Sequence, residues 1–133
     1  RDREIAMHGN LNRFLICLAL LMMSAIAPAE ETVVEFSGTG NRTTAEFKVD
    51  SPWILDWIIN SDYDKMVSFD LDLVDAKTGV LVGNILRAKA LGNGVRMFNT
   101  SGTYRFRINA SFVRWNLKVK ELTAEEAELY TPR

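Results

Sequence analysis

The sequence predicts an all-β protein: a two-sheet antiparallel sandwich of jelly-roll or immunoglobulin-like type with one short C-terminal helix. Three observations support this prediction. Long runs of alternating apolar and polar residues recur along the chain, as strands with one buried face require. Clusters of Gly, Asn, Asp and Ser separate these runs at intervals of about ten residues, which is typical of sandwiches and barrels. Only residues 122–130 carry a helical pattern.

The chain begins with a segment that we interpret as a targeting signal. Residues 7–29 contain the short positive region at Arg13, an apolar core over residues 14–27 and a small-x-small site that ends at Ala29. This pattern predicts a secretory signal peptide cleaved near Ala29. The apolar run is too short and wrongly flanked to span a bilayer, so we expect no transmembrane segment in the mature chain.

Removal of this signal peptide limits the chemistry of what remains. We expect residues 1–6 to be an upstream extension of the reading frame and residues 30–133 to form one domain, periplasmic or secreted. The single histidine, His8, and the single cysteine, Cys17, would leave with the signal peptide. Nucleophile systems and zinc sites that need imidazole or thiol groups are then excluded. We expect a non-enzymatic protein with no cofactor, and the net charge of −1 gives no reason to expect a nucleic-acid partner.

The first three expected strands are separated by turn residues. The pattern predicts them over residues 32–37, 43–49 and 53–59, with Gly38-Thr-Gly-Asn41 and Asp50-Ser-Pro52 between them. The third run is apolar on both faces: one carries Trp53, Leu55, Trp57 and Ile59, and the other carries Ile54, Asp56 and Ile58. Such a strand is either central in the sandwich or presents an exposed apolar platform.

The later strands alternate more regularly. The pattern predicts them over residues 67–73, 80–86, 95–99, 104–109 and 113–119. Residues 75–79 form the expected turn between the first two, with Gly79 in the left-handed position of a bulged loop. Gly92-Asn-Gly94 is interpreted as a further turn. In the helical segment, Thr123 is the expected N-cap and Glu126 its reciprocal capping partner.

Two stretches of the chain resemble a known kind of domain. Phe36-Ser-Gly-Thr-Gly-Asn-Arg-Thr-Thr44, Phe47-Lys-Val49 and Pro52-Trp-Ile-Leu-Asp-Trp57 are similar to the opening of small exported bacterial β-sandwich domains. Gly102-Thr-Tyr-Arg-Phe-Arg-Ile-Asn109 and Trp115-Asn-Leu-Lys-Val119 are similar to the two strands that close such domains. The resemblance implies export and a sandwich architecture. It implies no catalytic residues, because the matched positions are mostly core and turn residues.

The candidate ligand-binding residues are Trp53, Trp57 and Asp56. Planar aromatic side chains on an open sheet face hold sugar rings in many sandwich modules, and polar neighbours contact the hydroxyl groups. The alternative is that Trp57 and Trp115 are core residues that face each other across the two sheets. Asp56 is expected either to face solvent or to pair with an arginine such as Arg114.

One alternative function rests on a pair of carboxylates. Asp70 and Asp72 lie two apart on one strand, so they share a face at about 7 Å. That separation is compatible with a small carboxylate-dependent hydrolase. The structural interpretation of the same pair is a cross-strand charge ladder with Arg105 and Arg107.

A second alternative rests on Asp62 and Asp64, which would offer oxygen ligands to Ca²⁺ in a calcium-stabilised structural or adhesion module. No other metal site is expected. The leading prediction is an exported non-enzymatic module of the bacterial envelope, a binding or accessory protein with a carbohydrate or another protein as its ligand.

Overall fold

The computed structural model describes residues 31–63 and 65–130 of the chain. The predicted extension and signal peptide, residues 1–6 and 7–29, lie outside these residues. The described part of the chain contains nine strands and one helix. Their bounds are β1 (Glu31–Thr39), β2 (Arg42–Thr43), β3 (Phe47–Val49), β4 (Trp53–Asn60), β5 (Ser68–Asp75), β6 (Leu81–Ala88), β7 (Gly92–Phe98), β8 (Gly102–Ser111), β9 (Arg114–Glu121) and α2 (Ala124–Glu128).

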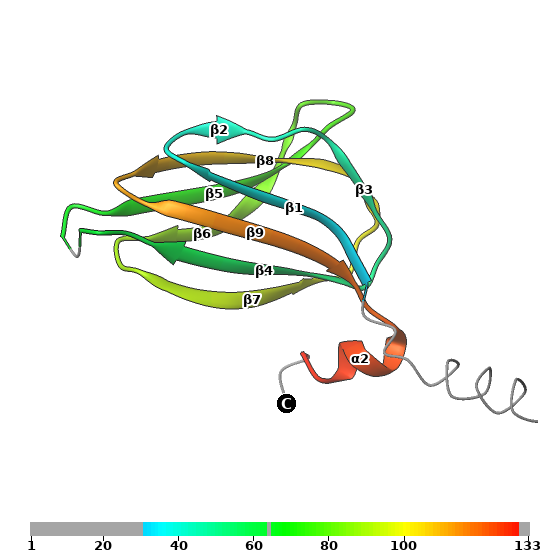
Figure 1. The fold of residues 1–133 in the computed structure, drawn as a ribbon. Coiled ribbons are helices and arrows are strands. Elements are labelled where there is room, and N and C mark those ends of the chain that lie inside the picture. Colours follow the sequence, from blue (N-terminus) through cyan, green and yellow to red (C-terminus); the bar gives the residue numbers. More distant parts are fainter. Residues whose placement is uncertain (1–30, 64, 131–133) are drawn as a thin grey trace, which may run out of the picture.

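The strands form two antiparallel sheets that pack face to face (Figure 1). One sheet has the order β1-β9-β4-β7; the other has the order β2-β8-β5-β6, with β3 also paired to β8. When β2 and β3 are taken as one interrupted strand, the pairing is nested: β1 with β9, β2 and β3 with β8, β4 with β7, and β5 with β6. This confirms the predicted two-sheet sandwich, and the nested order is that of a jelly roll rather than an immunoglobulin domain.

The core lies between the sheets and is made by the inward side of the alternating runs. The most deeply buried inward residues of β5 and β8 are Phe69, Leu71, Leu73, Phe106 and Ile108. The ring of Phe36 on β1 meets that of Phe106 edge to face, with centroids 6.2 Å apart, so aromatic contacts join the two sheets. Each fully buried side chain of this size contributes about 1.5–3 kcal/mol, which lets a small domain fold on its core alone.

Thr44 spans the interruption between β2 and β3. Its backbone N–H donates to the carbonyl of Phe106 at 2.9 Å, and its Oγ1 accepts from the N–H of Phe106 at 3.0 Å. Oγ1 also donates to the carbonyl of Ala45 at 3.0 Å. The side chain is 1% exposed and replaces a ladder hydrogen bond that the interrupted backbone cannot make. The single strand predicted over residues 43–49 is therefore wrong at its centre.

β7 begins earlier than the sequence indicated. The segment Gly92-Asn-Gly94, interpreted as a turn, belongs to this strand and pairs with residues 57–59 of β4. Gly94 explains the difference, because a Cβ atom at this position would lie 2.6 Å from Cζ2 of Trp57. Glycine is required here for close packing against an indole ring rather than for a turn.

One arginine joins the two sheets on the side where β6 and β7 are the outermost strands. Arg96 lies opposite Leu55 in the β4–β7 pair, so its side chain points toward the inside of the sandwich. Its guanidinium donates to the carbonyls of Asn84 at 3.3 Å and Ile85 at 2.9 Å, both on β6. The same group lies 5.3 Å from the ring centre of Phe98. Arg96 on β7 thus connects the two sheets at this side through hydrogen bonds to the backbone of β6.

The turn between β5 and β6 has the predicted form. Gly79 adopts a φ of +75°, as expected for its left-handed position. The carboxylate of Asp75 accepts hydrogen bonds from the backbone N–H groups of Lys77 at 2.8 Å and Thr78 at 3.1 Å. These bonds, that from Thr78 first and that from Lys77 second, hold the pKa of Asp75 below its ordinary value.

This turn predicts a pH dependence of stability. Since the pKa of Asp75 is lower in the folded chain, its contribution is present above the ordinary aspartate pKa and is lost as the pH falls through the folded value. Asp75→Asn should therefore be less stable than wild type near neutral pH. The difference in free energy of unfolding between the two proteins should become smaller below about pH 4. Urea unfolding of both proteins across this pH range measures the difference. A difference that stays constant with pH would contradict the stabilising role of the ionised Asp75 carboxylate.

The connections divide between the two ends of the sandwich. The β1–β2, β4–β5, β6–β7 and β8–β9 connections gather at one end, which we call the loop end (Figure 1). The first described residue, Glu31, pairs with Glu121 at the opposite end, where α2 follows. The helix is shorter than predicted but begins as predicted, with both hydrogen bonds of the Thr123–Glu126 capping box present. No helix among residues 31–63 and 65–130 is long and apolar enough to cross a membrane.

Candidate functional site

The prediction that Trp53 belongs to an exposed aromatic platform is wrong. Its side chain is 0% exposed, stacks on Phe98 with ring centres 4.2 Å apart, and donates from Nε1 to the carbonyl of Thr100 at 2.9 Å. The cause is the position of β4, which lies between β7 and β9 and turns the Trp53 side toward the other sheet. The sequence allowed this strand to be either central in the sandwich or an exposed apolar platform, and β4 is central.

Trp57 and Asp56 do not form a common site. Trp57 is half-buried on the inner face of β4, whereas Asp56 is half-buried on the outer face, opposite Lys118. Trp115 is a core residue, 2% exposed, but it lies in the same sheet as Trp57, so the two do not face each other across the sandwich. Asp56 is not paired with Arg114, whose carboxylate partner is Asp62.

The calcium candidates are not arranged as ligands in the described chain. Both carboxylate oxygens of Asp62 accept hydrogen bonds from Arg114, at 3.1 and 3.3 Å. Asp64 lies outside the described residues. Within residues 31–63 and 65–130 no three acidic, histidine or cysteine side chains gather as a metal site would require.

An amide group lies between the two carboxylates of the hydrolase candidate. Nδ2 of Asn84 donates to Oδ1 of Asp70 at 2.6 Å and to Oδ1 of Asp72 at 2.8 Å. The amide therefore occupies the space where the glycosidic oxygen or a water molecule would stand between catalytic carboxylates. The register places Arg107 directly opposite Asp72, as the predicted ladder requires. The ion pairs differ from that ladder, because Asp70 pairs with Arg87 and Arg105 pairs with Glu46.

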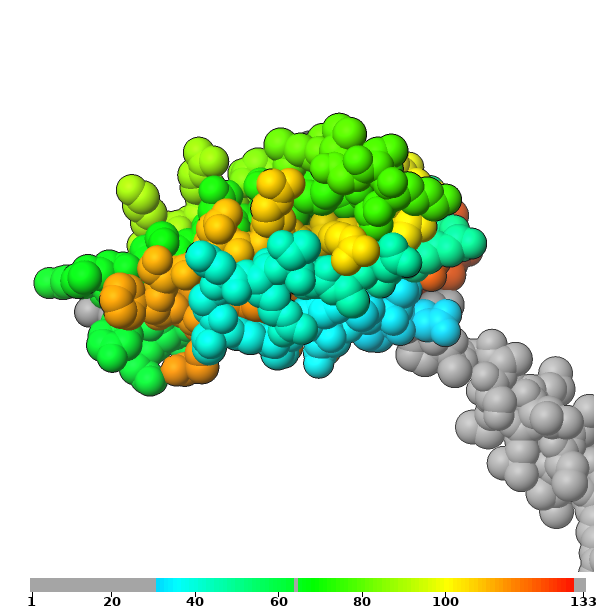
Figure 2. Space-filling view, turned by 90° about the horizontal axis from the view of Figure 1, so that it is seen from above, coloured from blue at the N-terminus to red at the C-terminus, as the bar shows by residue number. Residues whose placement is uncertain are grey.

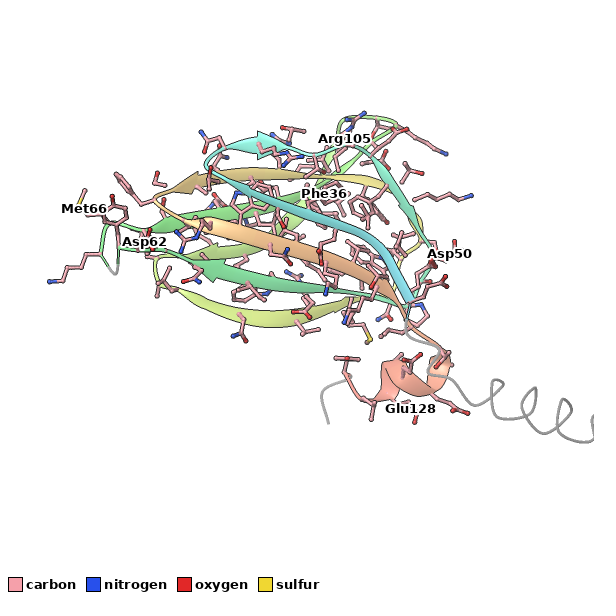
Figure 3. The ribbon with its side chains drawn as sticks, viewed as in Figure 1. Phe36, Asp50, Asp62, Met66, Arg105 and Glu128 are labelled. Carbon is pink, nitrogen blue, oxygen red and sulfur yellow. The ribbon has the colours of Figure 1, made fainter. Side chains whose placement is uncertain are left out.

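A cluster of exposed apolar side chains lies at the loop end, where sequence analysis placed no site. It consists of Tyr63 and Met66 on the β4–β5 connection and Phe112 on the β8–β9 turn, and we call these three residues the loop-end cluster. They are 60%, 80% and 55% exposed. Figure 2 shows the two segments, green and orange, side by side at one end of the molecule, and Figure 3 shows Met66 at the extremity of that end.

Two members of the loop-end cluster lie on unusual backbone. Met66 has a φ of 66° and Phe112 has a φ of 60°, and these are the two positive values among non-glycine residues of the described chain. The left-handed region costs a bulky residue about 1–2 kcal/mol, and Gly or Asn usually fills it. Both side chains are exposed, so burial does not offset this cost. Such combinations of strain and exposure are more typical of functional sites than of folding cores.

Hydrogen bonds tie the two segments of the cluster together. The hydroxyl of Ser61 donates to the carbonyl of Phe112 and accepts from the N–H of Tyr63 at 2.9 Å. The Tyr63 and Phe112 rings meet edge to face, 5.5 Å between centres and 67° between planes. The Asp62–Arg114 ion pair joins the same two segments, and both of its side chains line a hollow of about 200 Å³ together with Tyr63 and Phe112. Tyr63 and Phe112 are thus held together by the fold itself.

Sequence reasoning missed the cluster because alternation indicates which strand residues are buried and says little about turns. The available signal was Phe112, a large apolar residue in the two-residue connection between two strands, where turn-forming residues are expected. No protein-family model matches the chain, and no curated protein matches it.

Proposed function

We propose that the chain is an exported, non-enzymatic binding module of the bacterial envelope and that the loop-end cluster is its contact surface. The observation that carries the proposal is the exposure of three large apolar side chains, two of them on left-handed backbone. Folding gains little from these residues, so their presence is best explained by a contact with something outside the chain.

The position of the cluster also favours this role. Both ends of the described chain lie at the opposite end of the sandwich, as Figure 1 shows. Any segment or domain attached to those ends would leave the loop end open to a ligand. The resemblance to small exported bacterial sandwich domains supports export, since it extends over most of the sandwich.

The proposal predicts that Phe112 is dispensable for folding. In Phe112→Gly, relief of the left-handed strain gains about 1–2 kcal/mol. Loss of the ring contact with Tyr63 costs about 0.5–1.5 kcal/mol, and the added glycine entropy costs about 0.5–1 kcal/mol. We expect the free energy of unfolding to stay within about 1 kcal/mol of wild type, as measured by urea denaturation.

Phe106 provides the matched control, because it is the same residue type, 0% exposed and on the strand that leads to the turn. Phe106→Ala should lose about 3–5 kcal/mol. If Phe112→Gly were destabilised to a similar degree, the cluster would be part of the fold and the proposed function would be rejected.

A further inference from the structure

We propose that the loop-end cluster inserts into the apolar boundary of a phospholipid bilayer, so that the domain binds a membrane surface reversibly. This inference rests on the proposed function, since it names the partner of the same surface. Three features of the cluster favour a bilayer over a protein or a sugar: its convex shape, its small area and the hydrogen bonds already made by the polar groups beside it.

The cluster projects from the molecule. Met66 stands at the extremity of the loop end and is 80% exposed (Figure 3). A convex apolar tip needs a partner that surrounds it, and the acyl region of a bilayer does so without a preformed cavity. Aromatic and other large apolar side chains with charged neighbours are typical of the boundary between headgroups and hydrocarbon.

The apolar area is small for a stable protein interface. A typical interface buries about 800 Å² on each partner, and large aromatic side chains bury about 150–250 Å² each. Tyr63, Met66 and Phe112 are only partly exposed, so together they offer about half of that area. A few separate side chains are sufficient for reversible binding to a membrane surface.

The polar side chains beside the cluster already have hydrogen-bond partners within the chain. The hydroxyl of Ser61 has both a donor and an acceptor partner, and Asp62 and Arg114 form two hydrogen bonds together. A sugar site needs such groups free to contact hydroxyls, and here a sugar would have to displace them.

Charged side chains also lie near the tip. Asp62 is neutralised by Arg114, and the exposed Lys65 stands beside the cluster, where an ammonium would meet phosphate headgroups. We expect binding to zwitterionic vesicles that changes little with salt, since the apolar side chains of the cluster make the contact.

The test places a tryptophan reporter at each end of the predicted mature chain, residues 30–133, because the apolar residues 14–27 would themselves enter a bilayer. Phe112→Trp reports on the loop end, and Leu129→Trp, at a residue 81% exposed beside α2, is its matched control. Each protein is mixed with phosphatidylcholine vesicles that contain brominated acyl chains, and tryptophan emission is recorded. Trp53, Trp57 and Trp115 are present in both variants, so their emission is a background common to the two measurements. Near-ultraviolet circular dichroism verifies that both variants fold.

We expect a blue shift and bromine quenching for Phe112→Trp and neither for Leu129→Trp. Vesicle flotation of Phe112→Gly in the same chain should show about a tenfold loss of affinity, equivalent to about 1.4 kcal/mol. Quenching of both reporters, of Leu129→Trp alone or of neither would overturn the inference, as would a shift of Phe112→Trp with soluble oligosaccharides only. The last result would leave the proposed function intact, which the unfolding of Phe112→Gly tests separately.

Discussion

Replacing Trp53 with alanine is expected to reduce the free energy of unfolding by about 3–5 kcal/mol, the range for removal of a large buried aromatic side chain. The indole is 0% exposed, stacks on Phe98 and fills the space between β4 and the facing sheet. Its Nε1–H bond to the carbonyl of Thr100 would also be lost, and that carbonyl would keep only the longer bond from the hydroxyl of Tyr104, at 3.4 Å. A domain of this size has about 5–15 kcal/mol of stability in total, so much of it depends on this residue.

Two further substitutions show whether burial causes the loss. Trp57→Ala removes the same side chain from a half-buried position and should cost less than Trp53→Ala. Trp53→Phe keeps an aromatic ring against Phe98 and should recover part of the loss. Thermal and urea unfolding of the three variants provide the comparison. Equal losses at Trp53 and Trp57, or a Trp53→Ala protein as stable as wild type, would contradict the burial of Trp53.

Thr44→Val is the second large expected effect, with a loss of about 1–3 kcal/mol. Valine has nearly the shape of threonine but no hydroxyl, so the buried N–H of Phe106 would lose its acceptor. The backbone hydrogen bond from Thr44 to the carbonyl of Phe106 would remain, because it does not involve the side chain. The expected loss is therefore the cost of one unsatisfied buried donor in the gap between β2 and β3.

Thr44→Ser is the control for this prediction, because serine keeps the hydroxyl and removes only a methyl group. We expect it to retain more stability than Thr44→Val when both are compared by urea unfolding. Hydrogen exchange at the Phe106 amide offers a local measurement, and it should accelerate in Thr44→Val alone. A valine variant at least as stable as the serine variant would show that the hydroxyl does not carry the hydrogen bond.

Period-two alternation predicted most strands, because a half-buried strand must place its apolar residues on one side. Alternation could not decide the environment of β4, because both faces of this strand are apolar. It therefore did not show whether Trp53 is a core residue or part of an exposed aromatic platform. It also carried no information on which sheet each strand joins. That is why Trp57 and Trp115, expected to face each other, lie in the same sheet.

The candidate site depended on residues that alternation does not describe. Tyr63, Met66 and Phe112 lie in connections, and their proximity depends on the nested pairing that brings the β4–β5 and β8–β9 connections to one end. Phe112 was the one local signal, since a bulky residue at a turn contradicts turn chemistry. The sequence does not show that Phe112 is exposed, that its backbone is left-handed or that its ring contacts Tyr63. These properties are known only from the structure.

Arg96 has a consequence for the behaviour of the protein at high concentration. An outermost strand usually offers free carbonyls to a strand from another molecule, which is how folded sheets begin to aggregate. On β6, the carbonyls of Asn84 and Ile85 are already hydrogen-bonded to this guanidinium, and the pairing of β6 with β5 is broken by two register shifts. An incoming strand would find two acceptors occupied and no regular edge to follow. Arg96, which connects the two sheets within one molecule, thus also hinders the pairing of β6 with a strand of another molecule.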